Sequence, residues 1–363
     1  MHKFHTTDQD NNLETLIRLA ISSGASDIHL SSGHRAALRV HGELNYIDET
    51  GIFSREALRD FAHSILDESQ WERFNETGDL DFAYTFDKQR FRGSLYREMN
   101  GVGFTFRLVP SEIRSLDELG LPEVLKTMSA KHRGLFLATG PTGHGKSSTL
   151  AAIIGEINQQ RKAHIVTIED PIEYIHTPAK SVIHQREVGH DTENFASGIR
   201  HVLRQDPDVI MIGEMRDLET ISAAITAAET GHLVFGTLHT QDASQSIERI
   251  VDVFPPHQQN QIRLQLAYTL LGICSQQLIP TSDVKGRVCA TEILIMTPAI
   301  RASIREGKTS SIRNALMTGL AQGMHTMEQD LVRLFREGRI SRATAKDFAY
   351  DQPELERMLS SGM

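Results

Sequence analysis

A glycine-rich segment at 140–147 carries the residues with the clearest chemistry. It reads Gly-Pro-Thr-Gly-His-Gly-Lys-Ser and fits the pattern G-x-x-x-x-G-K-[ST], with a predicted strand before it and a predicted helix after it. Glycines let backbone N–H groups turn toward phosphate oxygens, and Lys146 adds a positive charge for the β and γ phosphates. Ser147 can hold Mg²⁺, so ATP and Mg²⁺ are the expected cofactors. The expected nucleotide contacts are Thr142, Gly143, His144, Gly145, Lys146, Ser147 and Ser148.

Carboxylates follow two other apolar stretches. The stretch 209–214 ends in Gly-Glu, which places Glu214 where it can activate the attacking water. The stretch 165–173 ends with three carboxylates in five residues. Alone, such a run is better interpreted as a solvated acidic turn, but beside a phosphate-binding loop it favours groups that hold Mg²⁺ or water. We expect Glu169 to bind the metal and Glu173 to handle water.

Two histidines flank a further apolar stretch, 233–238. His239 follows it, at the carboxyl end of a predicted strand, where an imidazole could contact the γ-phosphate. His232 precedes it. A lone histidine is more often a structural hydrogen-bond donor, and this alternative applies most to His232. We expect His239 to act in catalysis and His232 to contact the nucleotide.

A parallel sheet is needed to bring these residues together. The four candidate strands are 135–138, 165–168, 209–212 and 233–238. They lack polar alternation, which is typical of parallel strands buried on both faces. Predicted helices begin between or after them at Lys146, Phe195, Leu218 and Ala243. This repetition predicts an α/β nucleotide-binding domain over 121–363, with a helical region from about Thr297-Pro298 onward.

The first 109 residues predict a separate, smaller α+β domain. An apolar stripe beginning at Leu13 has the spacing of an amphipathic helix, and Ser54 is a candidate N-cap for a second one. Later segments alternate like strands, the last two being separated by the turn signal Asn100-Gly101. Residues 110–120 begin with a proline and polar residues, and are the predicted linker.

Composition narrows the functional classes. A chain of 363 residues favours two domains, and a net charge of −9 provides no basic footprint for nucleic acid. No apolar run is long enough to span a bilayer, and the first residues are polar rather than those of a secretory signal, so we expect a cytoplasmic protein. Cys274 and Cys289 are expected to be core thiols.

The order of the motifs resembles that of the secretion ATPases. In that superfamily, segments like 140–147, 169–173, 213–214 and 230–239 are the Walker A motif, Asp box, Walker B motif and His box. The chain is similar, from about Leu13 to Ile340, to the PilT-type pilus retraction ATPases. The segments that carry this likeness are 185–189, 213–220 and 249–255, and Ser26-Asp27-Ile28-His29-Leu30 resembles the family's PAS-like N-terminal domain.

The resemblance implies a hexameric motor for type IV pilus retraction and twitching motility. The fold would be α/β, with a RecA-like P-loop ATPase domain, a smaller PAS-like α+β domain and a helical C-terminal part. ATP would lie between subunits, where Arg92 and Arg107 reach the phosphates of a neighbour's nucleotide. For Arg90 and Arg97, a basic strand face in water is as good an interpretation as contact with a phosphate. Rotation about the linker would turn hydrolysis into force.

The resemblance also implies partners and a location. The partners would be other copies of the chain, a PilC-like inner-membrane platform protein and a second retraction ATPase, with no nucleic acid. Contact with the membrane would be peripheral and through these partners, at the cytoplasmic face of the bacterial inner membrane.

Three departures from the family pattern stand out. His144 replaces the usual serine, and we expect activity to survive this change. Arg92 lies in a segment where many relatives have a nearby asparagine and glutamine, and the segment 299–306 differs from the family's retraction element at Ala302 and Ser303. Without a four-cysteine zinc site or an extra N-terminal domain, retraction is favoured over assembly. The alternatives are a related ATPase of another secretion or DNA-transfer system and a non-hydrolysing accessory ring subunit.

Overall fold

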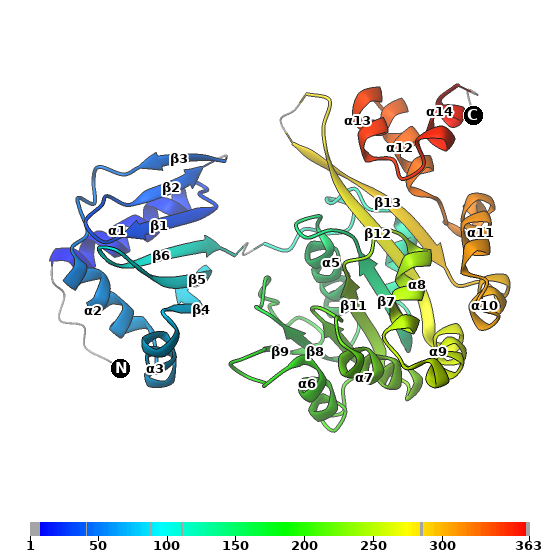
Figure 1. Cartoon of the computed structure of the whole chain (residues 1–363), viewed down its shortest axis with the longest axis horizontal. Helices are drawn as coiled ribbons and strands as arrows, with labels where there is room; N and C mark the ends of the chain where they lie inside the picture. The colour runs from blue at the N-terminus through cyan, green and yellow to red at the C-terminus, as the bar shows by residue number, and fades with distance from the viewer. Residues whose placement is uncertain (1–7, 41, 88, 110–111, 284–285, 361–363) are drawn as a thin grey trace. The chain divides into compact units, whose positions relative to one another are not determined.

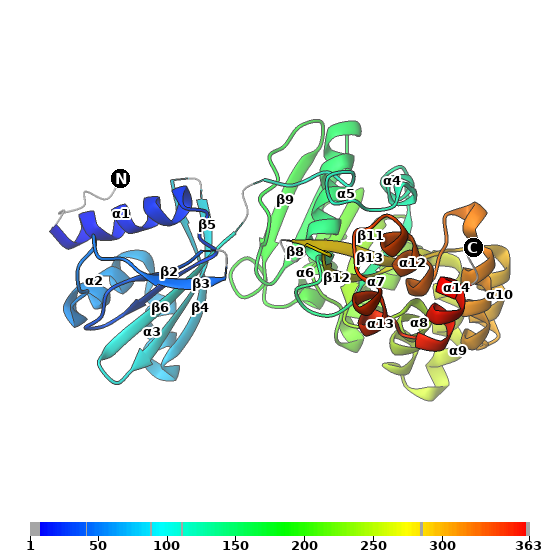
Figure 2. The ribbon, with the colours of Figure 1, turned by 90° about the horizontal axis from the view of Figure 1, so that it is seen from above.

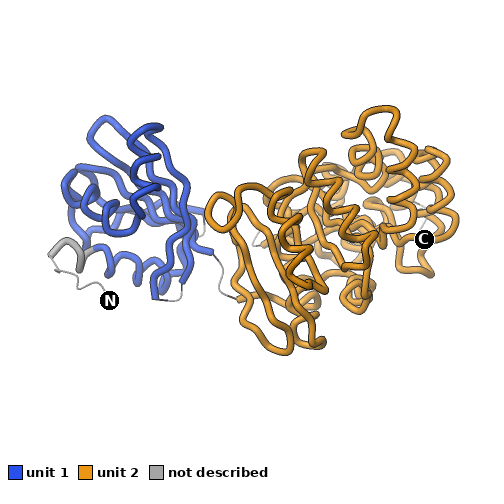
Figure 3. Tube along the Cα trace, turned by 90° about the horizontal axis from the view of Figure 1, so that it is seen from below, with its two compact units in different colours: residues 1–111 blue, residues 112–363 orange. Residues whose placement is uncertain are grey.

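The chain folds into two compact units, residues 1–111 and 112–363 (Figure 3). The computed structural model describes residues 8–40, 42–87, 89–109, 112–283 and 286–360. Pro110 and Ser111, which begin the predicted linker, lie outside the described residues, as do residues 1–7. The remainder of the predicted linker belongs to the second unit, where Leu116 is buried in the core.

The first unit is a six-stranded antiparallel sheet with helices on one face (Figures 1 and 2). Its strands are β1 (Asp27–Ser31), β2 (Ala37–Val40), β3 (Glu43–Tyr46), β4 (Asp79–Phe86), β5 (Gln89–Glu98) and β6 (Gly101–Leu108), in the order β3-β2-β1-β6-β5-β4. Its helices are α1 (Asp8–Ser22), α2 (Arg55–Ile65) and α3 (Glu68–Thr77). Alternate strand residues such as Phe91, Leu95 and Phe106 pack against these helices, while the intervening residues form the other face.

The structure confirms the predicted helix cap of the first unit and moves its predicted hairpin turn by one residue. Ser54 caps α2 as expected, its hydroxyl accepting a hydrogen bond from the backbone N–H of Ala57 at 3.1 Å. The hairpin turn lies at Met99-Asn100, one residue earlier than predicted, because Gly101 already pairs with Glu98 at the start of β6. A side chain at Gly101 would meet the Ser32 hydroxyl oxygen at 2.7 Å.

The second unit is built on a seven-stranded sheet in the order β13-β12-β7-β11-β10-β8-β9. Its strands are β7 (Gly134–Thr139), β8 (His164–Glu169), β9 (Val182–Glu187), β10 (Val209–Ile212), β11 (Leu233–Leu238), β12 (Leu270–Pro280) and β13 (Arg287–Ile295). All neighbours are parallel except β12 and β13. The predicted parallel sheet and α/β class are confirmed, whereas β9, β12 and β13 had no sequence prediction.

Helices cover both faces of this sheet (Figure 1). On one face lie η1 (Glu123–Leu125), α4 (Lys126–Ser129) and α5 (Lys146–Gln160), and on the other α6 (Phe195–Val202), α7 (Leu218–Glu229), α8 (Ala243–Asp252) and α9 (Pro256–Thr269). The four predicted helix starts are confirmed, and three of these helices have an Asn or Asp N-cap whose side chain accepts a backbone hydrogen bond.

The helical C-terminal region is also confirmed. It consists of α10 (Pro298–Arg305), α11 (Ile312–Thr318), α12 (Met327–Arg336), α13 (Arg342–Phe348) and α14 (Gln352–Ser360), with short 3-10 turns at Thr309–Ser311 and Leu320–Gln322. Thr297 caps α10, as the sequence predicts. The last three helices form a small core with Ile279 and Val288 of the β12–β13 pair. None of the helices in the described residues is long and apolar enough to cross a bilayer.

Candidate functional site

The glycine-rich loop joins β7 to α5 at the carboxyl edge of the sheet. Gly140 has φ of +132°, and a side chain there would lie 2.3 Å from the backbone oxygen of Gln276, so only glycine fits. Gly143 and Gly145 also have positive φ, and α5 begins directly after Gly145. The helix N-terminus and the loop N–H groups together favour an anion at this place.

Lys146 is the first residue of α5, and its side chain folds back toward the loop. Its residue is only 8% exposed, and Nζ donates hydrogen bonds to the carbonyls of Gly140 at 2.8 Å and Pro141 at 2.9 Å. Burial lowers the pKa of Lys146, whereas the charges of Glu214 and Glu173 act to raise it. A buried ammonium held by two neutral carbonyls is well placed to exchange them for phosphate oxygens, which carry charge.

His239 connects the loop to Glu214. Its Nε2 lies 2.7 Å from Glu214 Oε1, and its Nδ1 lies 3.4 Å from the hydroxyl of Thr142. Burial and the charge of Lys146 lower the pKa of His239, so the imidazole is neutral at pH 7. A neutral ring that donates from Nε2 to Glu214 has an acceptor at Nδ1 for Thr142. The structure thus brings the ends of β7, β10 and β11 together as the sequence predicts.

Arg216 is a contact that the sequence analysis missed. Its Nε makes an ion pair with the same oxygen of Glu214 that His239 contacts. Arg216 follows Glu214 by two positions, but its side chain is 74% exposed and no periodicity marks it. Glu214 therefore faces two donors at the place where the sequence analysis expects the water-activating base.

Glu169 supports the turn that carries Glu173. It is 6% exposed and accepts hydrogen bonds from the Thr167 hydroxyl at 2.6 Å, the Gln185 amide at 3.2 Å and the Glu173 backbone N–H at 3.4 Å. Burial raises the pKa of Glu169. Glu173 itself is exposed, and its charge acts on Lys146. The metal contact of Glu169 stays a prediction, beside a structural role that the sequence did not indicate.

The remaining loop residues make contacts that tie the loop down. His144 Nδ1 accepts a hydrogen bond from the backbone N–H of Leu278 on β12 at 3.1 Å, and burial lowers the pKa of its ring. The Ser148 hydroxyl lies 2.6 Å from the hydroxyl of Tyr174, a partner that the sequence analysis missed. Ser147 lies in the first turn of α5. Among the described residues, no three His, Cys, Asp or Glu side chains form a metal-binding group.

The structure does not bring His232 to this edge. His232 precedes β11, whereas His239 follows it, and six strand residues separate the two by about 20 Å. The His232 Nδ1 lies 2.9 Å from the Ala227 backbone oxygen and 3.2 Å from the Thr230 hydroxyl. The expected nucleotide contact of His232 is therefore not formed within one chain, because the strand direction places it at the opposite end of the sheet.

Arg92 and Arg107 lie in the first unit. They are direct cross-strand neighbours on β5 and β6, on the exposed face of the sheet. Arg107 Nε lies 2.8 Å from Asp27 Oδ1. Arg97 points to the other face, where it donates to the Asn75 backbone oxygen at 2.6 Å and lies 5.5 Å from the centre of the Phe74 ring. The Arg97 side chain thus packs against α3, whereas its contact with a phosphate stays a prediction.

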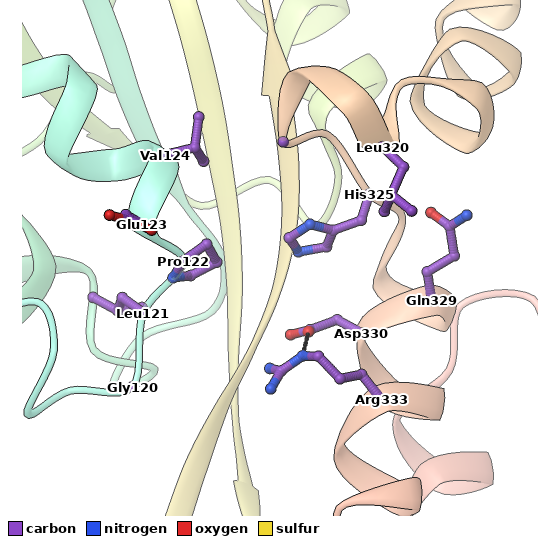
Figure 4. Close-up of a pocket in the computed structure, with 11 residues that line it drawn as sticks. Gly120, Leu121, Pro122, Glu123, Val124, Leu320, His325, Gln329, Asp330 and Arg333 are labelled. Atoms are coloured by element: carbon purple, nitrogen blue, oxygen red, sulfur yellow. Dashed lines mark hydrogen bonds and ion pairs between the residues drawn. The ribbon is translucent and has the colours of Figure 1, made fainter.

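A cavity of about 530 Å³ in the second unit is separate from this site (Figure 4). It is lined by Gly120, Leu121, Pro122, Glu123, Val124, Leu320, Gly323, His325, Gln329, Asp330 and Arg333. Asp330 Oδ1 accepts a hydrogen bond from Arg333 Nε at 2.7 Å at its wall. None of these residues belongs to the glycine-rich loop or to the strand ends beside it.

A buried histidine behind the acidic turn predicts how stability depends on pH. His176 is 6% exposed, and burial lowers its pKa to about 4 from an unfolded value of about 6.5. The unfolded chain then binds more protons between these values, so stability falls as the pH drops from 6.5 to 4. Going from pH 7 to pH 5, we expect this residue to cost about 2 kcal/mol. Urea unfolding of wild type and His176→Gln at both pH values measures the difference.

The comparison between the two proteins isolates His176. Burial also raises the pKa of Glu292 to about 7, and this acts in the opposite direction between pH 4.5 and 7 in both proteins. The His176→Gln variant should therefore lose less stability at pH 5 than wild type. Equal losses in the two proteins would contradict the assignment.

The chain is similar to several known proteins. The family described as type II/IV secretion system protein matches residues 9–341. A Pseudomonas aeruginosa protein, the type IV pilus retractation ATPase PilT, is 44% identical over 92% of this chain and 97% of its own length. A Neisseria gonorrhoeae twitching motility protein is 45% identical over 88% of this chain and 85% of its own. The solved pilus retraction motor PilT with bound ADP has a TM-score of 0.89 at 44% identity, covering 95% of this chain and 99% of that one.

Proposed function

Because the chain belongs to the type II/IV secretion system protein family, we propose that it is an ATP-hydrolysing motor that retracts type IV pili and drives twitching motility. The observation that carries this proposal is the junction of Thr142, His239 and Glu214 beside Lys146. A P-loop that had lost hydrolysis would not need a water-activating carboxylate held by a histidine.

The cofactor site fits a nucleotide with Mg²⁺. The loop N–H groups and Lys146 would hold the β and γ phosphates, and Ser147 with Glu169 would hold the metal. The metal supplies charge neutralisation between the phosphates when bound. Glu214 takes the proton of the attacking water, Glu173 helps to place that water, and His239 keeps Glu214 oriented. Thr142 to Ser148 enclose the phosphates.

A ring of six copies would complete the site. In that arrangement Arg92 and Arg107 of one subunit reach the phosphates bound by another, which would stabilise the charge that develops during hydrolysis. The Asp27 carboxylate supports this, since its pair with Arg107 holds that guanidinium on the exposed sheet face. His232, which is remote from the site in its own chain, would act only across such an interface.

The working partners follow from the same proposal. The motor would act at the cytoplasmic face of the bacterial inner membrane, on a platform protein of the pilus and beside a second retraction ATPase. The proposal includes no nucleic-acid partner, because the net charge of −9 provides no basic footprint for nucleic acid.

Phosphate release by the purified full-length chain, with oligomer size from light scattering in the same samples, tests the proposal. Hexamers that hydrolyse ATP, and that restore twitching to a piliated bacterium lacking its own retraction ATPase, would support it. Hydrolysis without any rescue would favour a motor of another secretion or DNA-transfer system. ATP binding without turnover would instead indicate an accessory ring subunit.

A further inference from the structure

The loop that carries His239 is fastened to the C-terminal part of the second unit. Residues 239–242 join β11 to α8. The backbone oxygen of Gln241 accepts a hydrogen bond from the Tyr350 hydroxyl at 2.9 Å. The backbone N–H of Ala243 donates to Glu292 Oε1 at 2.9 Å. The backbone is therefore held two and four residues beyond His239 by side chains that belong to none of the nucleotide motifs.

Tyr350 is itself held firmly. It lies between α13 and α14, and burial raises the pKa of its phenol, so the hydroxyl remains a donor. On one side of it, the Phe348 backbone oxygen accepts a hydrogen bond from the Gln277 amide of β12 at 3.1 Å. On the other side, the Asp351 N–H donates to Glu328 of α12 at 2.9 Å. The hydroxyl is thus presented to Gln241 from a fixed backbone.

An arginine strengthens this attachment. Arg313 of α11 forms ion pairs with Glu328 at 3.1 Å, with Asp351 at 3.5 Å and with Glu354. Glu328 and Glu354 are buried, so these pairs are poorly screened by solvent. The segment around Tyr350 is consequently joined to α11 as well as to α12.

Glu292, which holds the Ala243 N–H, lies on the edge strand β13. Side chains of the C-terminal region contact this edge. The neighbouring Thr291 donates from the backbone N–H to Asp330 Oδ2 at 2.8 Å, and its hydroxyl lies 2.9 Å from His325 Nε2. Asp330 and His325 line the cavity of Figure 4. Because β13 is an edge strand, these contacts take the place of a further strand and hold Glu292 in register.

We propose that Tyr350 is a positioning residue for ATP hydrolysis, its hydroxyl holding the Gln241 carbonyl so that His239 stays against Glu214 and Thr142. The inference rests on the proposed function. A loop anchored only at its strand and helix ends can shift by fractions of an ångström, and small displacements of orienting groups lower rates strongly. Tyr350 does not touch the nucleotide site itself, so its effect falls on turnover rather than on binding.

Tyr350→Phe in the full-length chain tests this, since it removes one oxygen and keeps the ring. We expect kcat for ATP to fall by about 3- to 10-fold, the worth of one well-placed hydrogen bond. KM for ATP and the thermal midpoint should stay near their wild-type values. Tyr268→Phe is the matched control, because Tyr268 is 70% exposed and its hydroxyl has no hydrogen bond among the described residues. It should leave kcat unchanged.

A double variant shows whether Tyr350 acts through His239. In a His239→Asn background, adding Tyr350→Phe should lower kcat no further, because the group being positioned is already gone. Additive losses would contradict positioning through His239, as would an unchanged kcat in the single variant. A kcat loss that tracks a fall in thermal midpoint would mean a merely structural role. No turnover by the unaltered chain would contradict the proposed function and the positioning role together. Normal turnover in both wild type and Tyr350→Phe would contradict only the positioning role.

Discussion

Glu214→Gln should lower the rate of ATP turnover by about 10²- to 10⁴-fold, the range for loss of a general base. Glutamine has the same shape and its amide oxygen can still accept the hydrogen bond that His239 Nε2 makes at 2.7 Å. It cannot take a proton from water. The loop and Lys146 keep their contacts, so ATP affinity should change by no more than a few-fold. Phosphate release and binding of a fluorescent ATP analogue measure the two quantities.

Glu219→Gln is the matched control for this substitution. Glu219 lies in the first turn of α7, with a side chain 69% exposed and a pairing with Arg200 at 3.5 Å. Its loss should leave turnover unchanged. If Glu214→Gln also retained wild-type turnover, Glu173 would be the better candidate for the base.

Lys146→Ala should weaken ATP binding and lower the rate of hydrolysis. The side chain is buried and makes two hydrogen bonds to loop carbonyls, which hold its ammonium inside the phosphate-binding loop. Losing charge-assisted hydrogen bonds worth about 1.5–3 kcal/mol corresponds to a weakening of ATP binding by about 10- to 150-fold. Turnover should fall at least as far, because the same ammonium stabilises the charge that develops on the phosphates. Isothermal titration with ATP and phosphate release measure the effects.

The exposed Lys162 offers a control of the same residue type. Lys162→Ala should bind and hydrolyse ATP like wild type. The thermal midpoint of Lys146→Ala without nucleotide shows whether the loop has collapsed. A variant that kept wild-type affinity at an unchanged midpoint would contradict the role of Lys146. Together, the Glu214 and Lys146 variants separate the chemical step from binding, because only the first should keep an ATP affinity close to that of wild type.

Much of the second unit could be predicted because its loop, strands and helix starts are encoded by residues that are adjacent in the sequence. The glycine-rich loop is recognised from eight adjacent residues, and the buried strands 165–168 and 233–238 are recognised from continuous apolar runs. The helix starts carry their own capping residues, such as Asp217 and Asp242. Each of these signals needs only neighbours along the chain.

The strand β12 could not be predicted from such local signals. It contains the polar residues Ser275, Gln276 and Gln277, all of them buried. Ser275 pairs with the Thr139 hydroxyl at 2.8 Å, and Gln276 donates to the Thr149 hydroxyl at 2.8 Å. A run of polar residues can form a central strand only when groups from distant parts of the chain make hydrogen bonds with its buried side chains. The spacing of residues within the run does not indicate these partners.

Short local patterns encode the class of the fold, the phosphate-binding loop and the carboxylates at the strand ends, so these could be predicted from the residues alone. How these parts meet depends on the tertiary structure. It joined Thr142, His239 and Glu214, placed His232 at the far end of β11, and brought Tyr350 onto a loop 109 residues away. Such contacts depend on strand order, register and helix packing, which arise from the balance of many weak interactions across the whole unit rather than from any local run of residues.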